Sequence, residues 1–256
     1  MAESKPQQYI FYAVGEVFLL IVGILIALQV NNWNEERIEQ QQIKEYAQTL
    51  ISDLERDIAM VGSITKQMQH TLDRIGTLGD YARRQELDQL SNLDLFFLTS
   101  SAGYRPYQWN RSTVDQLKSS GALRKIKNSD LVNKITAYDS FTHHLDEDFM
   151  FDRDLMLDAI KMADEVVNSV YPFNDEVIAA MRAMFREPYA FPPTKLYAVY
   201  KDTELQLLTD DEHKLRVMAN KFEHLIGITA RSDFEIPELI KNANELIELL
   251  RNEYPE

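Results

Sequence analysis

The stretch "IFYAVGEVFLLIVGILIALQVNNWNEE", which begins at Ile10, decides the fold. Residues 10–30 are apolar apart from one ionisable side chain, Glu16. A helix rises ~1.5 Å per residue, so this run would span ~31 Å, which matches the ~30 Å hydrocarbon core of a bilayer. Tyr12 and Trp33 lie near its two ends, where aromatic residues mark the membrane–water interfaces. We therefore predict a transmembrane helix over residues 10–30.

A cleaved signal peptide is the alternative interpretation of this run. A signal sequence has an apolar core of ~7–15 residues and a small-residue cleavage site, whereas this run is longer and ends in Gln-Val-Asn-Asn-Trp. We expect an uncleaved anchor between a short tail, residues 1–9, and an extramembrane domain, residues 31–256. Lys5 makes the N-terminal flank more positive than the acidic flank after the run, and the more positive flank tends to stay cytoplasmic. The expected location is a bacterial inner membrane, with a cytoplasmic N-terminus and a periplasmic C-terminal domain.

The extramembrane domain is acidic and has no Cys. The 256-residue chain has a formal net charge of −14, nearly all of it outside the apolar run. Such a surface repels nucleic acids and anionic lipid headgroups. We expect no nucleic-acid partner and contact with the lipid bilayer only through the one span. The absence of Cys excludes disulfides, thiolate metal sites and thiol catalysis.

Apolar residues recur at steps of three and four after the membrane run, which predicts an amphipathic helix that continues from it as one rod. The predicted apolar stripe comprises Ile43, Tyr46, Leu50, Leu54, Ile58, Val61, Ile64, Met68, Leu72, Ile75 and Leu78. Gly62, Gly76 and Gly79 are the positions at which this rod would most readily break.

The rest of the chain also has helical spacing. A helix capped by Asn128 or Ser129 is predicted to end at Pro172, and a capping box is predicted between Thr113 and Gln116. Further helices are expected near 93–100, 113–120, 175–186, 210–231 and 237–254, and residues 196–200 fit a short strand or a helical turn. Gly and Pro number eight each, too few for a turn-rich β sandwich. We predict an all-α fold, in which one N-terminal transmembrane helix precedes an extramembrane bundle of long antiparallel helices.

Two stretches resemble a known family. "YAVGEVFLLIVGILIALQVNNWNEE" is similar to the opening of an uncharacterised family of single-span bacterial membrane proteins, with its Tyr-Ala-Ile-Gly-Glu, Ile-Ala-Leu-Gln and Asn-Asn-Trp-Asn elements. "STVDQLKSSGALRKIKNSDLVNKITAYDS" resembles the family's Leu-x-x-Ser-Gly-x-Leu-x-x-Ile-x-Asn segment. The family is a domain of unknown function, so the resemblance supports the single-span topology and implies no activity.

Glu16 requires an explanation because a carboxylate in lipid is costly unless it is protonated or paired. On a helix it shares a face with Gly23 and Ala27, a small-xxx-small pair that lets another helix approach closely. The predicted helix-packing face comprises Ala13, Glu16, Leu20, Gly23 and Ala27. The alternatives are a Glu16 side chain that reaches the headgroups and a proton-relay role.

Catalytic and metal motifs are missing from the sequence. It has no His-Glu-x-x-His, no Gly-x-Ser-x-Gly, no P-loop and no dinucleotide-binding fingerprint. His144 and Asp148 stand one helical turn apart and could share a metal, but the chain has no Glu-x-x-His pair of the kind that binds metals in helical bundles, so we expect surface or hydrogen-bonded histidines. We predict no catalytic residue, no metal and no cofactor. The acidic run "DEDFMFDRD", residues 146–154, is expected to form a solvated helix face, with a dock for a basic partner as the alternative.

The segment "AGYRPYQWNR" combines aromatic and Arg residues, which recur at interface hot spots. Its candidate protein-contact residues are Arg105, Tyr107, Trp109 and Arg111. The equally weighted alternative is that Tyr107 and Trp109 pack within the bundle.

These observations favour a non-enzymatic, membrane-anchored accessory, scaffold or assembly subunit of a larger inner-membrane complex. Its partners would be other transmembrane helices of that complex and proteins outside the membrane. A periplasmic ligand-sensing bundle that signals through a partner transmembrane helix is the second hypothesis, and a hydrolase or metalloenzyme is the third.

Overall fold

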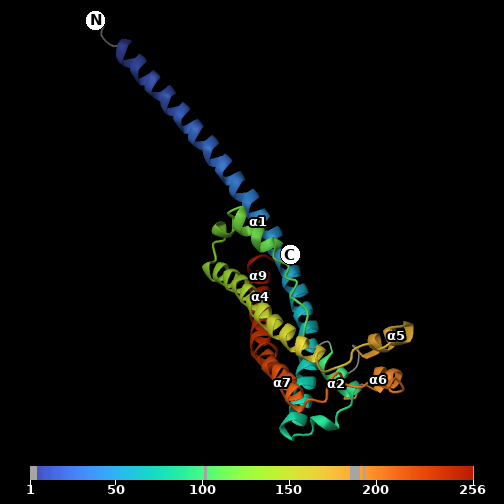
Figure 1. Ribbon diagram of the computed structural model, residues 1–256. Coiled ribbons are helices and arrows are strands. Elements are labelled where there is room, and N and C mark those ends of the chain that lie inside the picture. Colours follow the sequence, from blue (N-terminus) through green and yellow to red (C-terminus); the bar gives the residue numbers. More distant parts are fainter. Residues whose placement is uncertain (1–4, 101–102, 185–190, 193, 256) are drawn as a thin grey trace.

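The computed structural model describes residues 5–100, 103–184, 191–192 and 194–255, and every secondary-structure element in these ranges is helical. The all-α prediction is confirmed. Figure 1 shows a long rod, α1 (Lys5–Arg83), whose first half projects alone and whose second half enters the bundle.

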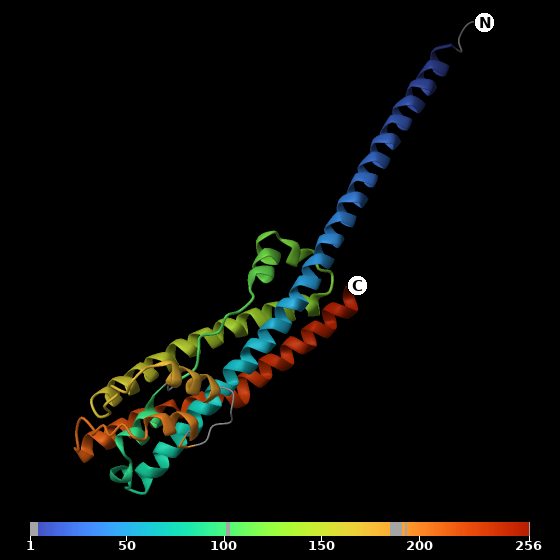
Figure 2. The ribbon, with the colours of Figure 1, turned by 90° about the vertical axis from the view of Figure 1, so that its right-hand side faces the viewer.

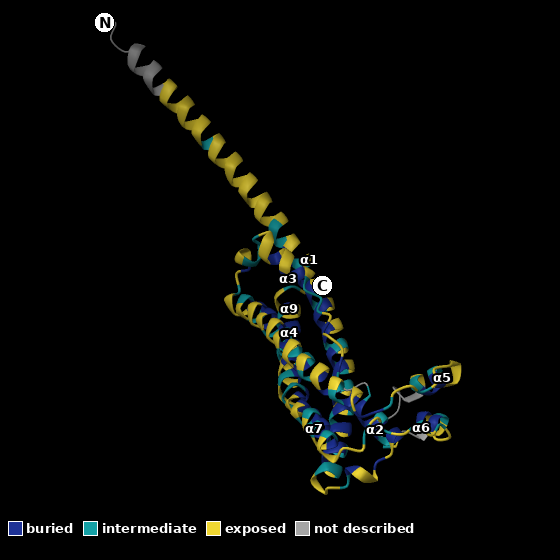
Figure 3. Ribbon diagram, viewed as in Figure 1, coloured by how far each residue is buried: buried dark blue, intermediate teal, exposed yellow. Residues whose placement is uncertain are grey.

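Helix α1 runs without a break over 79 residues, about 118 Å at ~1.5 Å per residue. Gly62, Gly76 and Gly79 do not interrupt it, so the prediction of one rod is confirmed. The helix holds an apolar segment long enough to cross a membrane, and none of that segment is covered by the rest of the chain. Figure 3 shows this half of the rod as an almost continuous exposed surface.

The second half of α1 buries one seam with steps that alternate between four and three. The seam comprises Ile43, Ala47, Leu50, Leu54, Asp57, Val61, Ile64, Met68, Thr71, Ile75 and Leu78. This repeat of 3.5 residues is typical of coiled-coil packing. The predicted seam residues Tyr46, Ile58 and Leu72 are only half-buried beside it. The buried seam positions next to them are occupied by Ala47, Asp57 and Thr71.

The chain leaves α1 at the far end of the bundle and then returns. It passes through η1 (Leu87–Gln89) and α2 (Asn92–Thr99), and residues 103–111 then run back as a non-helical segment, visible in Figure 2. We call residues 103–111 the connecting segment. It leads to α3 (Ser112–Ser119) and η2 (Ala122–Lys125).

Ion pairs show how far the chain has returned. Lys125 Nζ pairs with Glu39, and Lys127 Nζ lies 2.9 Å from Glu36 Oε1. Both carboxylates are on the part of α1 that follows the exposed segment. The next helix, α4 (Ser129–Asp164), therefore begins near this end and runs in the same direction as α1. The long return is what makes these two helices parallel.

The last third of the chain forms the antiparallel partner of both helices. Lys221 Nζ lies 2.7 Å from Asp158 Oδ2 at the far end of α4, and Arg251 Nη2 lies 2.8 Å from Glu55 Oε1 on α1. The elements follow one another directly as α7 (Glu212–Glu223), η3 (His224–Gly227), α8 (Ile228–Ala230), η4 (Arg231–Glu235) and α9 (Ile236–Glu253). The predicted gap after residue 231 is filled by the π-helical η4.

Two short helices form a smaller core with α2 beside the bundle. They are α5 (Asp175–Met184) and α6 (Thr194–Tyr200), so residues 196–200 are helical rather than a strand. Their shared apolar cluster comprises Leu93, Phe97, Val177, Ala180, Leu196 and Tyr200. Figure 1 shows α5 and α6 standing to one side of the long helices.

Helix ends confirm some capping predictions and contradict others. The Asn128 side chain accepts hydrogen bonds from the amides of Asp130 and Leu131, as expected for an N-cap. However, α4 ends at Asp164, well before the predicted end at Pro172. The predicted capping box of α3 is wrong, because Arg111 is the N-cap residue and makes no side-chain cap. The Thr113 hydroxyl is directed elsewhere, to a buried carboxylate described below.

Candidate functional site

The connecting segment crosses the bundle in contact with both parallel helices. Its Asn110 binds Asp57 on α1, and its Trp109 binds Asp146 on α4. Polar side chains that the sequence places far apart therefore meet in the interior. They form two buried polar centres, one in the first third of α4 and one just past its middle.

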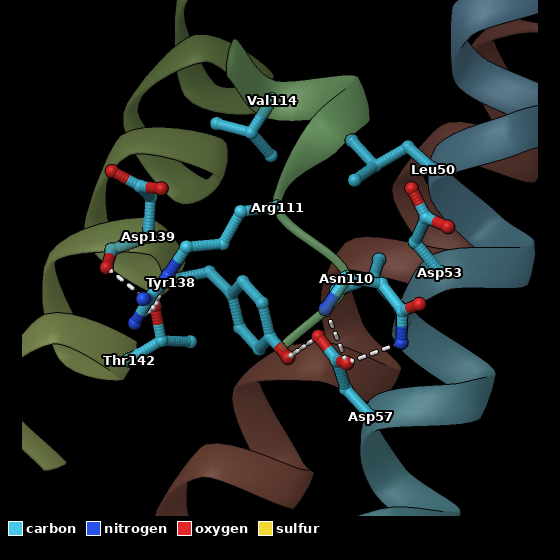
Figure 4. Close-up of a pocket in the computed structure, with 10 residues that line it drawn as sticks. Leu50, Asp53, Asp57, Asn110, Arg111, Val114, Tyr138, Asp139 and Thr142 are labelled. Atoms are coloured by element: carbon cyan, nitrogen blue, oxygen red, sulfur yellow. Dashed lines mark hydrogen bonds between the residues drawn. The ribbon is translucent and has the colours of Figure 1, made fainter. Parts of the chain in front are cut away.

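We name the first the Asp57 centre: Asp53, Asp57, Asn110, Thr113 and Tyr138. Figure 4 shows these residues except Thr113. Asp57 is only 2% exposed. Its Oδ1 accepts hydrogen bonds from the Asn110 backbone amide at 3.0 Å and from Asn110 Nδ2 at 2.8 Å. Its Oδ2 accepts one from the Tyr138 hydroxyl at 2.9 Å. One carboxylate thus joins α1, the connecting segment and α4.

Asp53 lies one helical turn before Asp57 and is also buried. It accepts a hydrogen bond from the Thr113 hydroxyl and forms an ion pair with Arg56 on the same helix. This bond is the contact that replaces the predicted capping box, since it draws the Thr113 hydroxyl away from its own helix end. Both oxygens of each buried carboxylate consequently have a donor.

Tyr138 is held as a neutral donor. Burial raises the pKa of its hydroxyl, and the charge of Asp57 raises it further. The proton therefore remains on the hydroxyl across the physiological pH range, and the bond to Asp57 is retained. A buried carboxylate without such donors would cost several kcal/mol.

The space inside the Asp57 centre is very small. The cavity is about 10 Å³, close to the minimum that one water needs. Small-molecule sites are usually ~300–1,000 Å³. With every carboxylate oxygen paired and no room for a substrate, the Asp57 centre fits a structural connection between helices rather than a catalytic site.

The candidate contact residues of the aromatic segment have different environments. Tyr107 is buried, and its ring stacks on that of half-buried Trp109 at 4.9 Å. Trp109 Nε1 donates to Asp146 Oδ1 at 2.9 Å, and Arg111 Nη2 lies 2.8 Å from Asp146 Oδ2. Arg105 remains exposed. Of the two interpretations, this placement favours packing of Tyr107 and Trp109 within the bundle.

We name the second the Arg231 centre: Tyr104, Asp148, Asp152, Arg231 and Glu235. Arg231 Nη2 lies 3.1 Å from Asp148 Oδ1, and its Nη1 lies 2.9 Å from Glu235 Oε1. Its Nε lies 3.6 Å from Asp152 Oδ2, which also accepts a hydrogen bond from the Tyr104 hydroxyl at 2.7 Å. One guanidinium thus faces three carboxylates.

The Arg231 centre leaves several polar atoms unsatisfied. Burial raises the pKa of Glu235, and Asp148 raises it further, while Arg231 lowers it. Burial also raises the pKa of Asp152, against the lowering effects of Tyr104 and Arg231. The buried atoms here that have no hydrogen-bond partner among the described residues are Tyr107 Oη, Asp148 Oδ2, Arg231 Nε and Glu235 Oε2. The Arg231 centre is therefore less complete than the Asp57 centre.

The prediction that the acidic run, residues 146–154, forms a solvated helix face is wrong in part. Asp154 is exposed, as predicted, but Asp152 is 3% exposed and Asp148 is half-buried. They lie four residues apart on the side of α4 that faces Arg231, so they face protein rather than solvent. The spacing was visible in the sequence, whereas the distant Arg231 that pairs with them was not.

The predicted helix-packing face lies on the part of α1 that projects from the bundle. Ala13, Glu16, Leu20, Gly23 and Ala27 are all exposed. Nothing in the described chain covers them, so their role in packing stays a prediction. Just beyond this segment an open groove of about 690 Å³ lies between α1 and the end of α9, and Trp33, Arg37, Lys44 and Tyr254 line part of it.

Comparisons with known proteins show which family the chain belongs to. No curated protein and no solved structure matches the chain significantly. A family model matches residues 16–169, which is more than half of the 256 residues. The match begins within the apolar segment and ends just after α4, so it contains the whole Asp57 centre but not Arg231 or Glu235. The chain belongs to the DUF6090 family, a family of unknown function.

Proposed function

We propose that this protein is a non-catalytic accessory, scaffold or assembly subunit of a larger inner-membrane complex, with α1 as its single transmembrane anchor. The observation that carries the proposal is the continuity of α1 from the exposed apolar segment into the bundle core. An unbroken helix couples the position of the domain to that of the membrane span. A partner that packs on the anchor would therefore hold the whole domain in one position.

The Asp57 centre supports this proposal. It ties α1 to the connecting segment and α4 through paired, buried carboxylates. Its ~10 Å³ cavity leaves no space for a substrate. The groove lined by Trp33, Arg37 and Tyr254 lies where a neighbouring helix would leave the membrane, and we propose it as a contact surface outside the lipid.

The test uses the absence of Cys in the chain, which makes single-Cys variants specific. Gly23→Cys lies on the proposed packing face, and Leu25→Cys lies on the opposite side of the helix. After attachment of a photocrosslinker in native membranes, Gly23→Cys should give a discrete adduct with another membrane protein, and Leu25→Cys should not. Equal adducts from both positions, or an adduct only with a second copy of the chain, would contradict the proposal.

A loss-of-contact experiment completes this test. Gly23→Leu should reduce recovery of the crosslinked partner because it blocks close helix approach. Glu16→Leu should reduce it less, since one membrane hydrogen bond is typically worth ~1 kcal/mol. The comparison is made at equal anchor level in the membrane. Full recovery with both changes would mean that the anchor is not the contact.

The proposed orientation places the N-terminus in the cytoplasm and the bundle in the periplasm of a bacterium. It rests on the flanking charges around Lys5 and on the single-span motif. A reporter that is active only in the periplasm, fused after Glu256, should be active. An active cytoplasmic reporter at the same site would reverse the orientation.

A ligand-sensing bundle is the second candidate, because an unbroken helix also transmits displacement to the membrane. The Asp57 centre argues against it, since its cavity is too small for an organic ligand. A small molecule that shifts the melting temperature of the purified protein and changes the crosslink from Gly23→Cys would favour the sensor.

A further inference from the structure

The edge of the Arg231 centre brings together three metal-binding side chains. His144 and Asp148 come from α4, and Glu235 comes from η4. One ligand atom from each, a His nitrogen or a carboxylate oxygen, lies within 4.8 Å of the other two. The sequence suggested only the first two residues, because Glu235 is distant along the chain.

The spacing of His144 and Asp148 fits coordination better than a hydrogen bond. His144 Nε2 lies 3.3 Å from Asp148 Oδ2, yet that oxygen has no hydrogen-bond partner among the described residues. Bonds of ~2.0–2.2 Å in tetrahedral geometry place two ligand atoms roughly 3.3–3.5 Å apart. The pair is therefore at the separation that a shared metal ion requires.

Arg231 leaves one carboxylate oxygen of Asp148 and one of Glu235 without a hydrogen-bond donor among the described residues. It pairs with Asp148 Oδ1 and Glu235 Oε1, whereas Asp148 Oδ2 and Glu235 Oε2 are buried without a donor in the described chain. The hydroxyl of Tyr107, itself 8% exposed, also lacks a partner there, and the charges of Asp152 and Glu235 act on it. Buried polar atoms of this kind usually indicate a bound ion or water.

Charge favours a divalent cation. When all three are ionised, the carboxylates of Asp148, Asp152 and Glu235 face the single positive charge of Arg231, which leaves an excess of two negative charges. One proton would remove half of this excess, and one divalent cation would remove all of it. An imidazole beside two carboxylates suits Zn²⁺ and similar transition metals better than Ca²⁺ or Mg²⁺.

We propose that His144 Nε2, Asp148 Oδ2 and Glu235 Oε2 bind one divalent transition-metal ion, with Zn²⁺ as its representative. Arg231 holds the two carboxylates from their other oxygens, as outer groups commonly do at metal sites. The Phe141 ring lies nearly parallel to the His144 ring, with 6.1 Å between the ring centroids. In η4 the Ile236 amide donates to the Arg231 carbonyl, and such π-helical turns occur frequently at functional sites.

The test is calorimetric titration of Zn²⁺ into the full-length protein, purified in detergent and stripped with EDTA. We expect one Zn²⁺ per chain. His144→Ala and Glu235→Gln should each weaken binding at least tenfold. His143→Ala is the matched control, because His143 is the adjacent residue with similar exposure, 59% against 53%, and lies 3.9 Å from Asp139 instead. It should bind Zn²⁺ as the unchanged protein does.

Folding is checked by circular dichroism, and Co²⁺ provides a second readout through its visible absorption in a tetrahedral site. Zn²⁺ should raise the melting temperature of the unchanged protein and of His143→Ala, but not that of His144→Ala. Failure to bind Zn²⁺ would overturn the proposal. So would equal weakening by His143→Ala and His144→Ala, or full affinity in Glu235→Gln.

Discussion

The two buried polar centres use similar side chains and reach different states. In the Asp57 centre both oxygens of each buried carboxylate have a donor, and the donors come from α1, the connecting segment, α3 and α4. In the Arg231 centre one guanidinium serves three carboxylates, and several buried atoms have no partner among the described residues. A hydrogen-bond network in which every polar atom is paired fixes the helices in place. A network with unpaired buried atoms can still bind an ion or a water molecule.

The strongest test of this difference is Asp57→Ala. It would leave the Asn110 amide, Asn110 Nδ2 and the Tyr138 hydroxyl without an acceptor. Each buried donor left unsatisfied typically costs ~1–3 kcal/mol, so we expect a loss of ~3–5 kcal/mol in total. Chemical denaturation of the full-length protein in detergent measures the free energy of unfolding. Asp57→Asn keeps one acceptor oxygen and should cost less. A loss below ~1 kcal/mol for Asp57→Ala would mean that the Asp57 centre does not hold the helices together.

Arg231→Met should give the next largest effect, and its size should depend on pH. At pH 8 three carboxylates would lose their counter-charge, with an expected cost of ~2–3 kcal/mol, below the usual ~3–5 kcal/mol for a broken buried pair because protons can replace the cation. At pH 5 the carboxyls of Asp152 and Glu235, whose pKa values are already raised, should take up protons and reduce this cost. Thermal melts at the two pH values measure it. An equal loss of stability at pH 8 and at pH 5 would contradict the idea that protons on Asp152 and Glu235 can replace the charge of Arg231.

Thr113→Val tests a single bond of the Asp57 centre. Loss of the hydroxyl leaves the buried Asp53 carboxylate short of one donor, which should cost ~1–2 kcal/mol. Gln116→Ala is the control, since Gln116 is exposed and would matter only if the predicted capping box existed. It should change the free energy of unfolding by less than ~0.5 kcal/mol. A larger loss of stability for Gln116→Ala than for Thr113→Val would contradict the bond between Thr113 and Asp53 and would favour the predicted capping box.

Glu235→Gln should produce the smallest change, and it should be stabilising. Because the pKa of Glu235 is raised in the folded state, the folded protein binds more protons than the unfolded chain above the ordinary carboxyl pKa. Its contribution to stability is therefore present at low pH and is lost as the pH rises through the raised pKa. The metal-free variant should melt higher than the unchanged protein at pH 8, and this advantage should shrink toward pH 5. A variant that melts lower at pH 8 would show that the charge of Glu235 is stabilising.

The family match adds a further contrast. Its residues, 16–169, include every member of the Asp57 centre, whereas Arg231 and Glu235 lie beyond it. The Asp57 centre is thus built from the part of the chain that defines the family. The Arg231 centre joins that part to the returning C-terminal helices.

Local sequence determined the rod, the helical class and several helix ends. Residues 10–30 have the length and composition of a membrane span, and the steps of three and four after Ile43 require a helix, because a helix repeats every 3.6 residues. Asn128 caps α4 because its short side chain reaches the next amides. These outcomes depend on neighbours within a few residues, so the sequence alone was sufficient for them.

Tertiary structure decided where the polar side chains meet. Asp57 stands on an apolar seam, which was a readable signal, but its donors Asn110 and Tyr138 are brought to it only by the returning connecting segment and by α4. Asp148 and Asp152 looked like a solvated face because their partner, Arg231, is distant in the chain. Whether a carboxylate is paired depends on which helix packs against it, and no local periodicity encodes that choice.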